Sequence, residues 1–155
     1  MDIKDSGNRR EFSTGAVRDI AEGKGRCDLI PLDVIYDKTL TAIERFKETG
    51  NTLHLQTAVY ESKFYPEIYT LLLEVSKHFE EGAKKYGESN WQKGIPVHCY
   101  IDSAVRHYLK HLRGDTDEPH NRAFVWNMLC CMWTCQHKPE LIDLPFVQNN
   151  NESKE

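Results

Sequence analysis

The sequence predicts an all-α fold, an antiparallel helical bundle preceded by an extended N-terminal arm. Three observations support this prediction. Apolar residues recur every three or four positions in several long segments, no segment alternates as a half-buried strand does, and turns rich in Gly or Pro separate the periodic segments. A length of 155 residues suits one domain, which we expect over residues 1–147 with a disordered tail at 148–155.

Residues 1–30 form the predicted arm, because they hold four of the nine glycines and show neither helical nor strand periodicity. Their six basic and six acidic side chains balance, and the whole chain has a net charge of −4. A nucleic-acid tail normally carries a block of one sign, so we expect no nucleic-acid polymer as a partner. An arm with so little apolar content gains little stability by folding onto its own subunit. We therefore expect it to pack across a subunit boundary in a homo-oligomer.

The first predicted helix begins at Pro31 and ends at Gly50, while residues 51–64 fit either a helix or a loop. The clearest helix is Glu67–Lys85, with Gly87 placed to end it. The predicted apolar face of this helix consists of Ile68, Leu71, Leu72, Val75, Phe79, Ala83 and Tyr86.

Two further helices are predicted after the turn-rich stretch 87–96, one from Val97 to Leu112 and one over 119–136. The last helix is apolar nearly all round, as a central, buried helix would be. The longest charge-free apolar run, Ala123–Cys135, has 13 residues, whereas a membrane span needs about 20. Without a secretory pattern, and with an odd number of cysteines, the chain is expected in the cytoplasm with no membrane partner.

Carboxylates on one flank of the helix 67–85 could hold a divalent cation. Glu74 and Glu81 lie two turns apart with His78 between them, and Mg²⁺ prefers oxygen ligands. A solvated face with salt bridges explains the same spacing, since Glu81 and Lys85 are also four residues apart. Both interpretations stay open.

Polar residues also gather around the start of the last helix. His120 and Asn127 are seven residues apart and share a face, and Asp117 and Glu118 precede them. An imidazole, two carboxylates and a helix N-terminus suit an anion-binding or catalytic site. Taken singly, His120 and Asn127 are also explained as hydrogen-bonded structural residues.

On the preceding helix, Asp102 and Arg106 are four residues apart and His107 follows directly. An Arg held by an Asp can present two N–H donors to a phosphate, although an ordinary helix ion pair has the same spacing.

Two segments outside the long helices carry nucleotide-binding residue types. The loop from Lys85 contains Asn90 and Trp91, which suit hydrogen bonding and stacking of a base, although Trp91 could equally cover the core. In the arm, glycines surround Lys24, and with Arg18 and Arg26 they could form a phosphate cradle. The spacing is not that of a P-loop.

Taken in order, these segments resemble the N-terminal domain family of dATP/dGTP diphosphohydrolases, which occurs largely in phages and their bacterial hosts. The resemblance rests on Ser13–Asp19, Gly23–Pro31, Glu81–Gly87, Asn90–Trp91, Asp102–His107, Gly114–His120 and Trp126–Asn127. It implies an all-α protein related to MazG-like nucleotide pyrophosphohydrolases, located in the host cytoplasm if a phage encodes it. Residues 36–66 then form an added, family-variable element.

The implied activity is hydrolysis of a purine (deoxy)nucleoside triphosphate to the monophosphate and pyrophosphate with Mg²⁺, or Mn²⁺, as cofactor. The implied catalytic residues are Glu81, Arg106 and His120. The implied metal ligands are Glu74, Glu81, Asp102 and Glu118. The implied substrate-binding residues are Arg18, Lys24, Arg26, Lys85, Asn90, Trp91, His107 and Asn127.

The carboxylate signature of MazG enzymes is not reproduced, because Lys84 follows Glu80 and Glu81 where that signature has a third Glu. A non-catalytic protein that sequesters a nucleotide or a nucleotide signal is therefore the alternative, and a purely structural accessory protein is a third. The base and sugar preference and the number of metal ions stay open.

Overall fold

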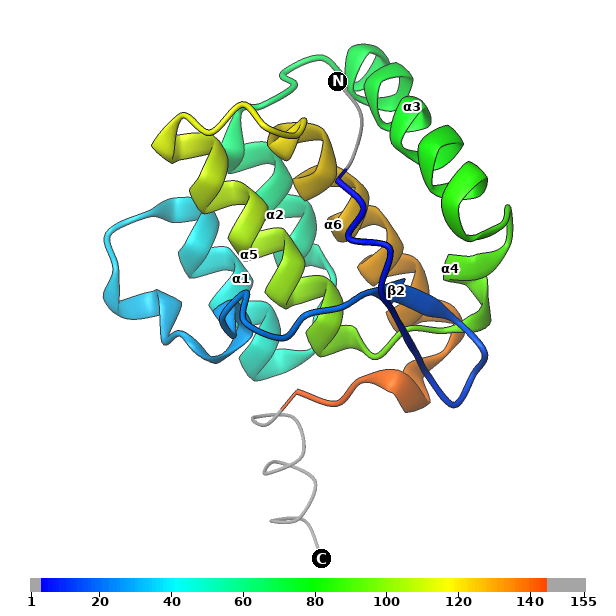
Figure 1. The fold of residues 1–155 in the computed structure, drawn as a ribbon. Helices are drawn as coiled ribbons and strands as arrows, with labels where there is room; N and C mark the ends of the chain where they lie inside the picture. Colours follow the sequence, from blue (N-terminus) through cyan, green and yellow to red (C-terminus); the bar gives the residue numbers. More distant parts are fainter. Residues whose placement is uncertain (1–3, 145–155) are drawn as a thin grey trace, which may run out of the picture.

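The computed structural model describes residues 4–144 and confirms the all-α architecture, with six α-helices and one small sheet in that range (Figure 1). The helices are α1 (Lys38–Thr49), α2 (Leu53–Ser62), α3 (Ile68–Tyr86), α4 (Asn90–Lys93), α5 (Val97–Arg113) and α6 (His120–His137). The tail predicted at 148–155 lies outside the described residues.

The centre of the molecule is the pair α5 and α6, which pack along each other and are joined by a short turn at Gly114. Gly114 has a φ of +92°, the left-handed conformation that ends a helix. As its apolar sequence predicts, α6 is buried on most sides, and Phe124, Met128 and Cys131 are fully buried. Both helices end within a residue or two of their predicted bounds.

The hairpin of α1 and α2 packs beside this pair, so the ambiguous stretch 51–64 is mostly helical. The predicted helix start at Pro31 is wrong. The chain first makes a 3₁₀ turn at Leu32–Val34, and α1 begins at Lys38 because Asp37 caps it. Asp37 Oδ1 accepts from the Leu40 N–H at 2.9 Å, which satisfies a donor that a helix start leaves unpaired.

A buried ion pair fixes the base of the arm to α1. Glu44 and Lys47 are each about 2 % exposed, and Lys47 Nζ donates to Glu44 Oε2 at 2.8 Å. The same carboxylate oxygen accepts from the Leu32 N–H, and Lys47 Nζ also donates to the Ile30 carbonyl. The two charges therefore satisfy each other and two backbone groups of the incoming chain.

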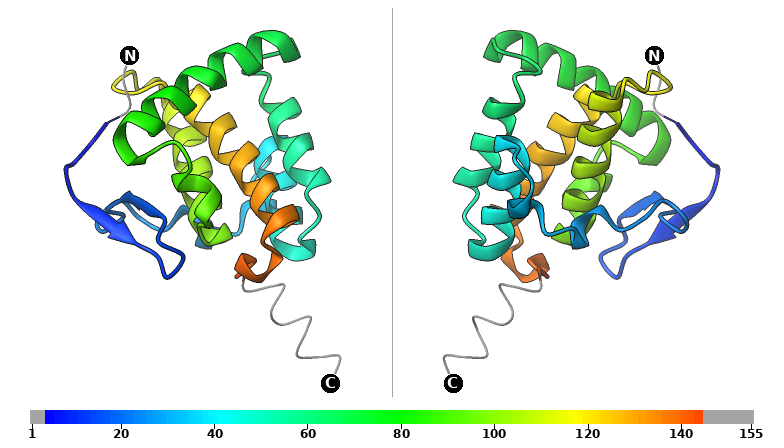
Figure 2. Two further views of the ribbon diagram at one scale, coloured as in Figure 1. Left: turned by 90° about the vertical axis from the view of Figure 1, so that its right-hand side faces the viewer. Right: turned by 90° about the vertical axis from the view of Figure 1, so that its left-hand side faces the viewer.

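The arm carries a two-stranded antiparallel sheet, contrary to the expectation of no strand: β1 (Arg9–Glu11) pairs with β2 (Val17–Asp19). The turn between the strands includes Gly15 at a φ of +86°. The arm packs against its own chain, on the side of α4 and α5 (Figure 2), and Ala16 is fully buried there. The contacts expected across a subunit boundary are thus made within one chain. The homo-oligomer stays a prediction.

The helix α3 crosses over α6 and turns a different face inward than its sequence predicts. Leu71 and Val75 are buried as expected, and so is His78, whereas Ile68 and Leu72 are more than half exposed. None of the helices in the described range 4–144 is long and apolar enough to cross a bilayer.

We predict that Lys47→Met lowers the free energy of unfolding by about 3–5 kcal/mol, because it leaves the Glu44 carboxylate buried without its cation. The double variant Glu44→Gln/Lys47→Met removes both charges and keeps an acceptor for the Leu32 N–H, so it should regain part of that loss. Urea unfolding followed by circular dichroism measures both. A single variant within about 1 kcal/mol of wild type would contradict the assigned role of the pair.

Candidate nucleotide-binding site

A cavity of about 880 Å³ opens between the arm, α3, the C-terminal half of α5 and the start of α6. This volume lies within the usual range of small-molecule sites. Basic side chains outnumber acidic ones in its wall, so the cavity suits an anionic ligand. The basic residues are Lys4, Arg10, Arg18, Lys24, Arg106, Lys110 and Arg113. The acidic residues are Asp5, Asp19, Glu88 and Glu118.

Aromatic rings form one side of the cavity, contributed by Phe79, Tyr86, Trp91 and Trp126. Trp91 packs edge-on against Phe79 with ring centroids 5.6 Å apart, so it both lines the cavity and covers the core. Flat apolar surfaces next to cationic groups are the combination that holds a base and its phosphates.

Arg18 reaches from β2 into the interior of the cavity. Its Nη2 donates to Ser103 Oγ at 2.9 Å and to Asn127 Oδ1 at 3.1 Å. The guanidinium also lies 5.4 Å from the centroid of the Tyr100 ring. Its Nη1 is buried and has no hydrogen-bond partner among the described residues, although Arg18 lines the cavity.

Three more buried nitrogens in the cavity wall, Arg10 Nε, His78 Nδ1 and Trp126 Nε1, also lack a partner within the described part of the chain. An unpaired buried polar group costs about 1–3 kcal/mol, and a ligand rich in hydrogen-bonding atoms would remove that cost. Burial, followed by the nearby cations of Arg122 and Arg18, lowers the pKa of His78 to about 3, so this imidazole is neutral at pH 7.

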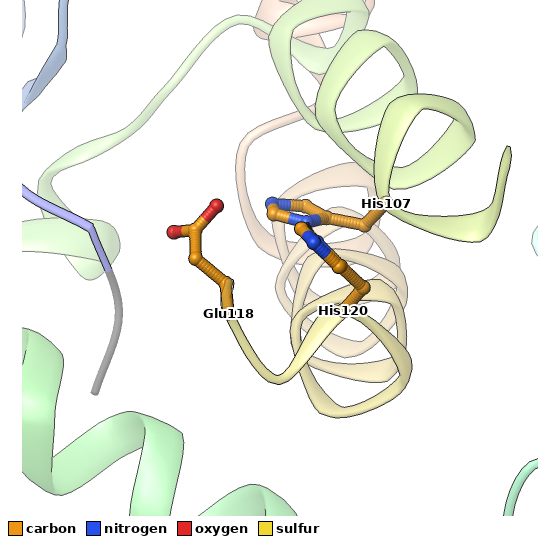
Figure 3. A group of neighbouring side chains, drawn as sticks. All are labelled: His107, Glu118 and His120. Carbon is orange, nitrogen blue, oxygen red and sulfur yellow. Dashed lines mark hydrogen bonds between the residues drawn. The ribbon is translucent and has the colours of Figure 1, made fainter. Parts of the chain in front are cut away.

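A cluster of imidazoles and carboxylates lies where α5 meets the start of α6 (Figure 3). Nδ1 of His107 is 2.8 Å from Nδ1 of His120, and Nε2 of His120 is 2.7 Å from Asp117 Oδ1. The Glu118 carboxylate points toward the two rings, with one atom of each of the three side chains within 4.8 Å of the others. His107 and Glu118 line the cavity, whereas His120 is fully buried behind them.

Electrostatics in this cluster set its charge at neutral pH. Burial, and then the facing His120, lowers the pKa of His107 well below its ordinary value. Hydrogen bonds from Lys4 and from His120 lower the pKa of Asp117 well below that of a free carboxyl. Asp117 is therefore ionised and His107 is neutral.

Two predicted site residues, Asp102 and Arg106, hold the arm, and of the two only Arg106 also lines the cavity. Asp102 is buried and accepts from the Cys27 N–H at 2.6 Å and from Arg106 Nη2 at 2.6 Å. Arg106 in turn donates to the carbonyls of Lys24 and Gly25. This pair is thus an ion pair of α5 that fastens the glycine-rich segment, and it leaves Arg106 in the cavity wall.

The two predicted asparagines are likewise engaged by the protein. Asn90 Oδ1 accepts from the Val17 N–H at 2.8 Å, and its Nδ2 donates to the Val17 carbonyl at 2.9 Å. Asn127 Nδ2 donates to the Ala123 carbonyl while its Oδ1 accepts from Arg18. Both amides therefore position β2 and Arg18, although both also line the cavity.

The four carboxylates expected to gather around a metal ion are not brought together. Glu81 accepts from Arg122 at 2.7 Å, and Glu74 pairs with Lys77 at the surface. Neither Glu81, Glu74 nor Asp102 lines the cavity. The face of α3 that packs on α6 explains this separation. Because His78 is buried on that face, Glu74 and Glu81 lie at its flank.

Two predicted phosphate contacts also lie elsewhere. Lys85 Nζ donates to the Lys4 carbonyl and so holds the start of the arm, and Arg26 pairs with Asp28 outside the cavity. Sequence reasoning missed other lining residues, among them Lys110 and Arg113. Their spacing of four and seven residues after Arg106 was the signal that could have found them. Other cavity residues that the sequence did not indicate include Lys4, Arg10 and Ser103.

The residues present do not fit the implied Mg²⁺ site. Mg²⁺ takes oxygen ligands in a nearly octahedral arrangement. Among the described residues, two groups of three side chains could share an ion, His107 with Glu118 and His120, and Asp115 with Asp117 and His120. Both groups include an imidazole, a ligand that suits other metals better.

One of three comparisons with known proteins finds a relationship. The family model described as dATP/dGTP diphosphohydrolase, N-terminal, matches residues 62–143, which is more than half of the chain. The matched region contains α3 to α6 and hence most of the cavity wall, while the arm lies before it. Searches of curated proteins and of solved structures found no match.

We predict that Asn90→Ala loosens the arm, because it removes both hydrogen bonds that hold Val17. A loss of about 1–3 kcal/mol raises the population of the open arm roughly 5- to 100-fold. Tryptic cleavage after Arg9, Arg10 and Arg18, followed by mass spectrometry, should accelerate accordingly, while the exposed neighbouring position in Gln92→Ala serves as control. Equal cleavage rates in wild type and Asn90→Ala would show that this amide does not hold the arm.

Proposed function

The chain belongs to the dATP/dGTP diphosphohydrolase N-terminal family, and we propose that it binds a purine (deoxy)nucleoside triphosphate and hydrolyses it to the monophosphate and pyrophosphate. The observation that carries this proposal is the cavity, which combines an excess of basic side chains with an aromatic side and with buried nitrogens that lack protein partners. A triphosphate offers the negative charge and acceptor oxygens, and a purine offers the flat surface.

The arrangement of the wall suggests how such a nucleotide lies. The rings of Trp91, Tyr86 and Phe79 come from α3 and α4, while Arg106, Lys110 and Arg113 come from α5. A base stacked on the first group would extend its phosphates toward the second. This orientation brings the phosphates near the cluster of His107 and Glu118, which also lies at the C-terminal end of α5.

The divalent cation is bound by the substrate and not by the protein in this proposal. Since the described residues do not form an oxygen cage, we propose that Mg²⁺, or Mn²⁺, arrives bound to the triphosphate, whose charge it offsets. The chain itself supplies the cationic wall.

A second function is favoured by the separation of the predicted carboxylates. A protein that only sequesters a nucleotide needs the cationic and aromatic wall but no set of metal-binding carboxylates. Glu74, Glu81 and Asp102 lie outside the cavity. The same cavity therefore also supports nucleotide binding without hydrolysis.

Turnover separates the two functions. We expect the purified protein to release pyrophosphate from dATP or dGTP with Mg²⁺, and to stop when EDTA removes the cation from the nucleotide. Mass spectrometry of mixed nucleotides, incubated with and without EDTA, measures this. Intact nucleotide recovered from heat-denatured protein, with no product under any condition, would reject hydrolysis and support sequestration.

Binding tests the cavity itself. We predict that Arg18→Met weakens binding of a dNTP roughly 10- to 100-fold, because a charge-assisted hydrogen bond contributes about 1.5–3 kcal/mol. Arg26→Met is the matched control, since Arg26 lies on the same arm but outside the cavity. Isothermal titration calorimetry gives both affinities. An equal loss in both variants would indicate a general charge effect and not a site at Arg18.

A further inference from the structure

Hydrogen bonds determine where the protons lie in the chain of Asp117, His120 and His107. Asp117 Oδ2 accepts from the Lys4 ammonium at 2.7 Å, so Asp117 acts as an acceptor, and Nε2 of His120, 2.7 Å from Asp117 Oδ1, carries a proton. When His120 carries this proton alone, its Nδ1 is an acceptor. The proton between the rings, whose Nδ1 atoms are 2.8 Å apart, therefore belongs to His107. This leaves Nε2 of His107 as an unprotonated acceptor.

The geometry of the two rings favours a hydrogen bond over a shared metal ion. The ring centroids are 5.1 Å apart and the two Nδ1 atoms 2.8 Å apart, so the nitrogens lie close to the line that joins the rings. The Nδ1–H of His107 therefore points along this line at the lone pair of His120 Nδ1. Two ligands of one metal ion would instead point at a common third position.

The space between the unprotonated nitrogen of His107 and the Glu118 carboxylate suits a bridging water molecule. Both side chains line the cavity, a ring nitrogen of His107 and a carboxylate oxygen of Glu118 lie within 4.8 Å of each other, and no hydrogen bond joins them among residues 4–144. Water can bridge two acceptors at such a separation by donating one hydrogen to each. Glu118 is oriented for this by the Lys4 N–H, which donates to its Oε1 at 2.7 Å.

From this arrangement we propose that His107 is the general base of the hydrolysis, acting on a water held between its Nε2 and the Glu118 carboxylate. Asp117 and His120 are positioning residues, because they fix the tautomer of His107. This inference rests on the proposed function, and it names the residue that activates the attacking water.

The water oxygen forms a bond to the α-phosphorus, the bond between that phosphorus and the bridging oxygen breaks, and pyrophosphate leaves with the electron pair. The water proton moves to His107 Nε2, and the Nδ1 proton of His107 moves to His120 Nδ1. The resulting imidazolium of His120 is stabilised by the Asp117 carboxylate, as in other Asp–His pairs.

Asp117→Asn tests the chain because Lys4 dictates how the new amide lies. Lys4 Nζ is 2.7 Å from Asp117 Oδ2, so the amide oxygen should face this ammonium and the NH₂ should face His120. Nε2 of His120 becomes an acceptor, both tautomers reverse, and Nε2 of His107 gains a proton. We expect kcat to fall roughly 10²- to 10⁴-fold with KM within a few-fold of wild type.

The matched control is Asp143→Asn. Asp143 binds the imidazole of His98 at 2.6 Å, at the other end of α5, so the control loses a similar pair away from the cavity. We expect its kcat to stay within a few-fold of wild type. A comparable loss of kcat in both variants would overturn the assignment, because it would reflect the loss of any His–Asp pair.

Ring-nitrogen NMR provides a readout that does not depend on activity. Long-range ¹H–¹⁵N spectra should show His120 protonated at Nε2 and His107 at Nδ1 in wild type, and both reversed in Asp117→Asn. Active wild type with His107 protonated at Nε2 would overturn this inference alone. The expected tautomers without hydrolysis of any nucleotide would overturn the proposed function instead. Visible Co²⁺ absorption bands that disappear in His107→Gln would identify a metal site and also overturn the inference.

Discussion

The docking of the arm on α4 and α5 is the constraint on which the site depends. Asp102 and Asn90 are buried, and each hydrogen-bonds the arm, Asp102 at Cys27 and Asn90 at Val17. A buried polar group that lost its partner would cost about 1–3 kcal/mol, so the helices and the arm stabilise each other. Arg18 enters the cavity only because β2 is held in this way.

This constraint divides the polar residues into two groups. One group holds the arm, including Asp102, Asn90 and Lys85. The other group faces the cavity, where Arg18, His107 and Glu118 have hydrogen-bonding capacity left for a ligand or a water. The chemistry of the cavity thus rests on few groups, and the remaining polar residues make those few rigid.

The sequence allowed the helices of the centre and the position of the cluster to be predicted, because both follow from local spacing. Local spacing predicted the bounds of α5 and α6 and the convergence of His120 with Glu118. Local spacing did not predict the inward face of α3. Apolar side chains such as Leu72 compete with His78 for burial, and only the way α3 crosses α6 decides which of them is buried. Lys4, which contacts Glu118 across 114 residues of sequence, left no local signal.

Hydrogen–deuterium exchange with a non-hydrolysable dGTP analogue most directly tests whether the arm closes over a nucleotide. Protection is expected in peptides covering β2 and the C-terminal half of α5, which both line the cavity. The α1–α2 hairpin, which lies outside the cavity, should exchange as it does without ligand. Unchanged exchange at β2 and α5, or protection confined to the hairpin, would contradict a nucleotide site beneath the arm.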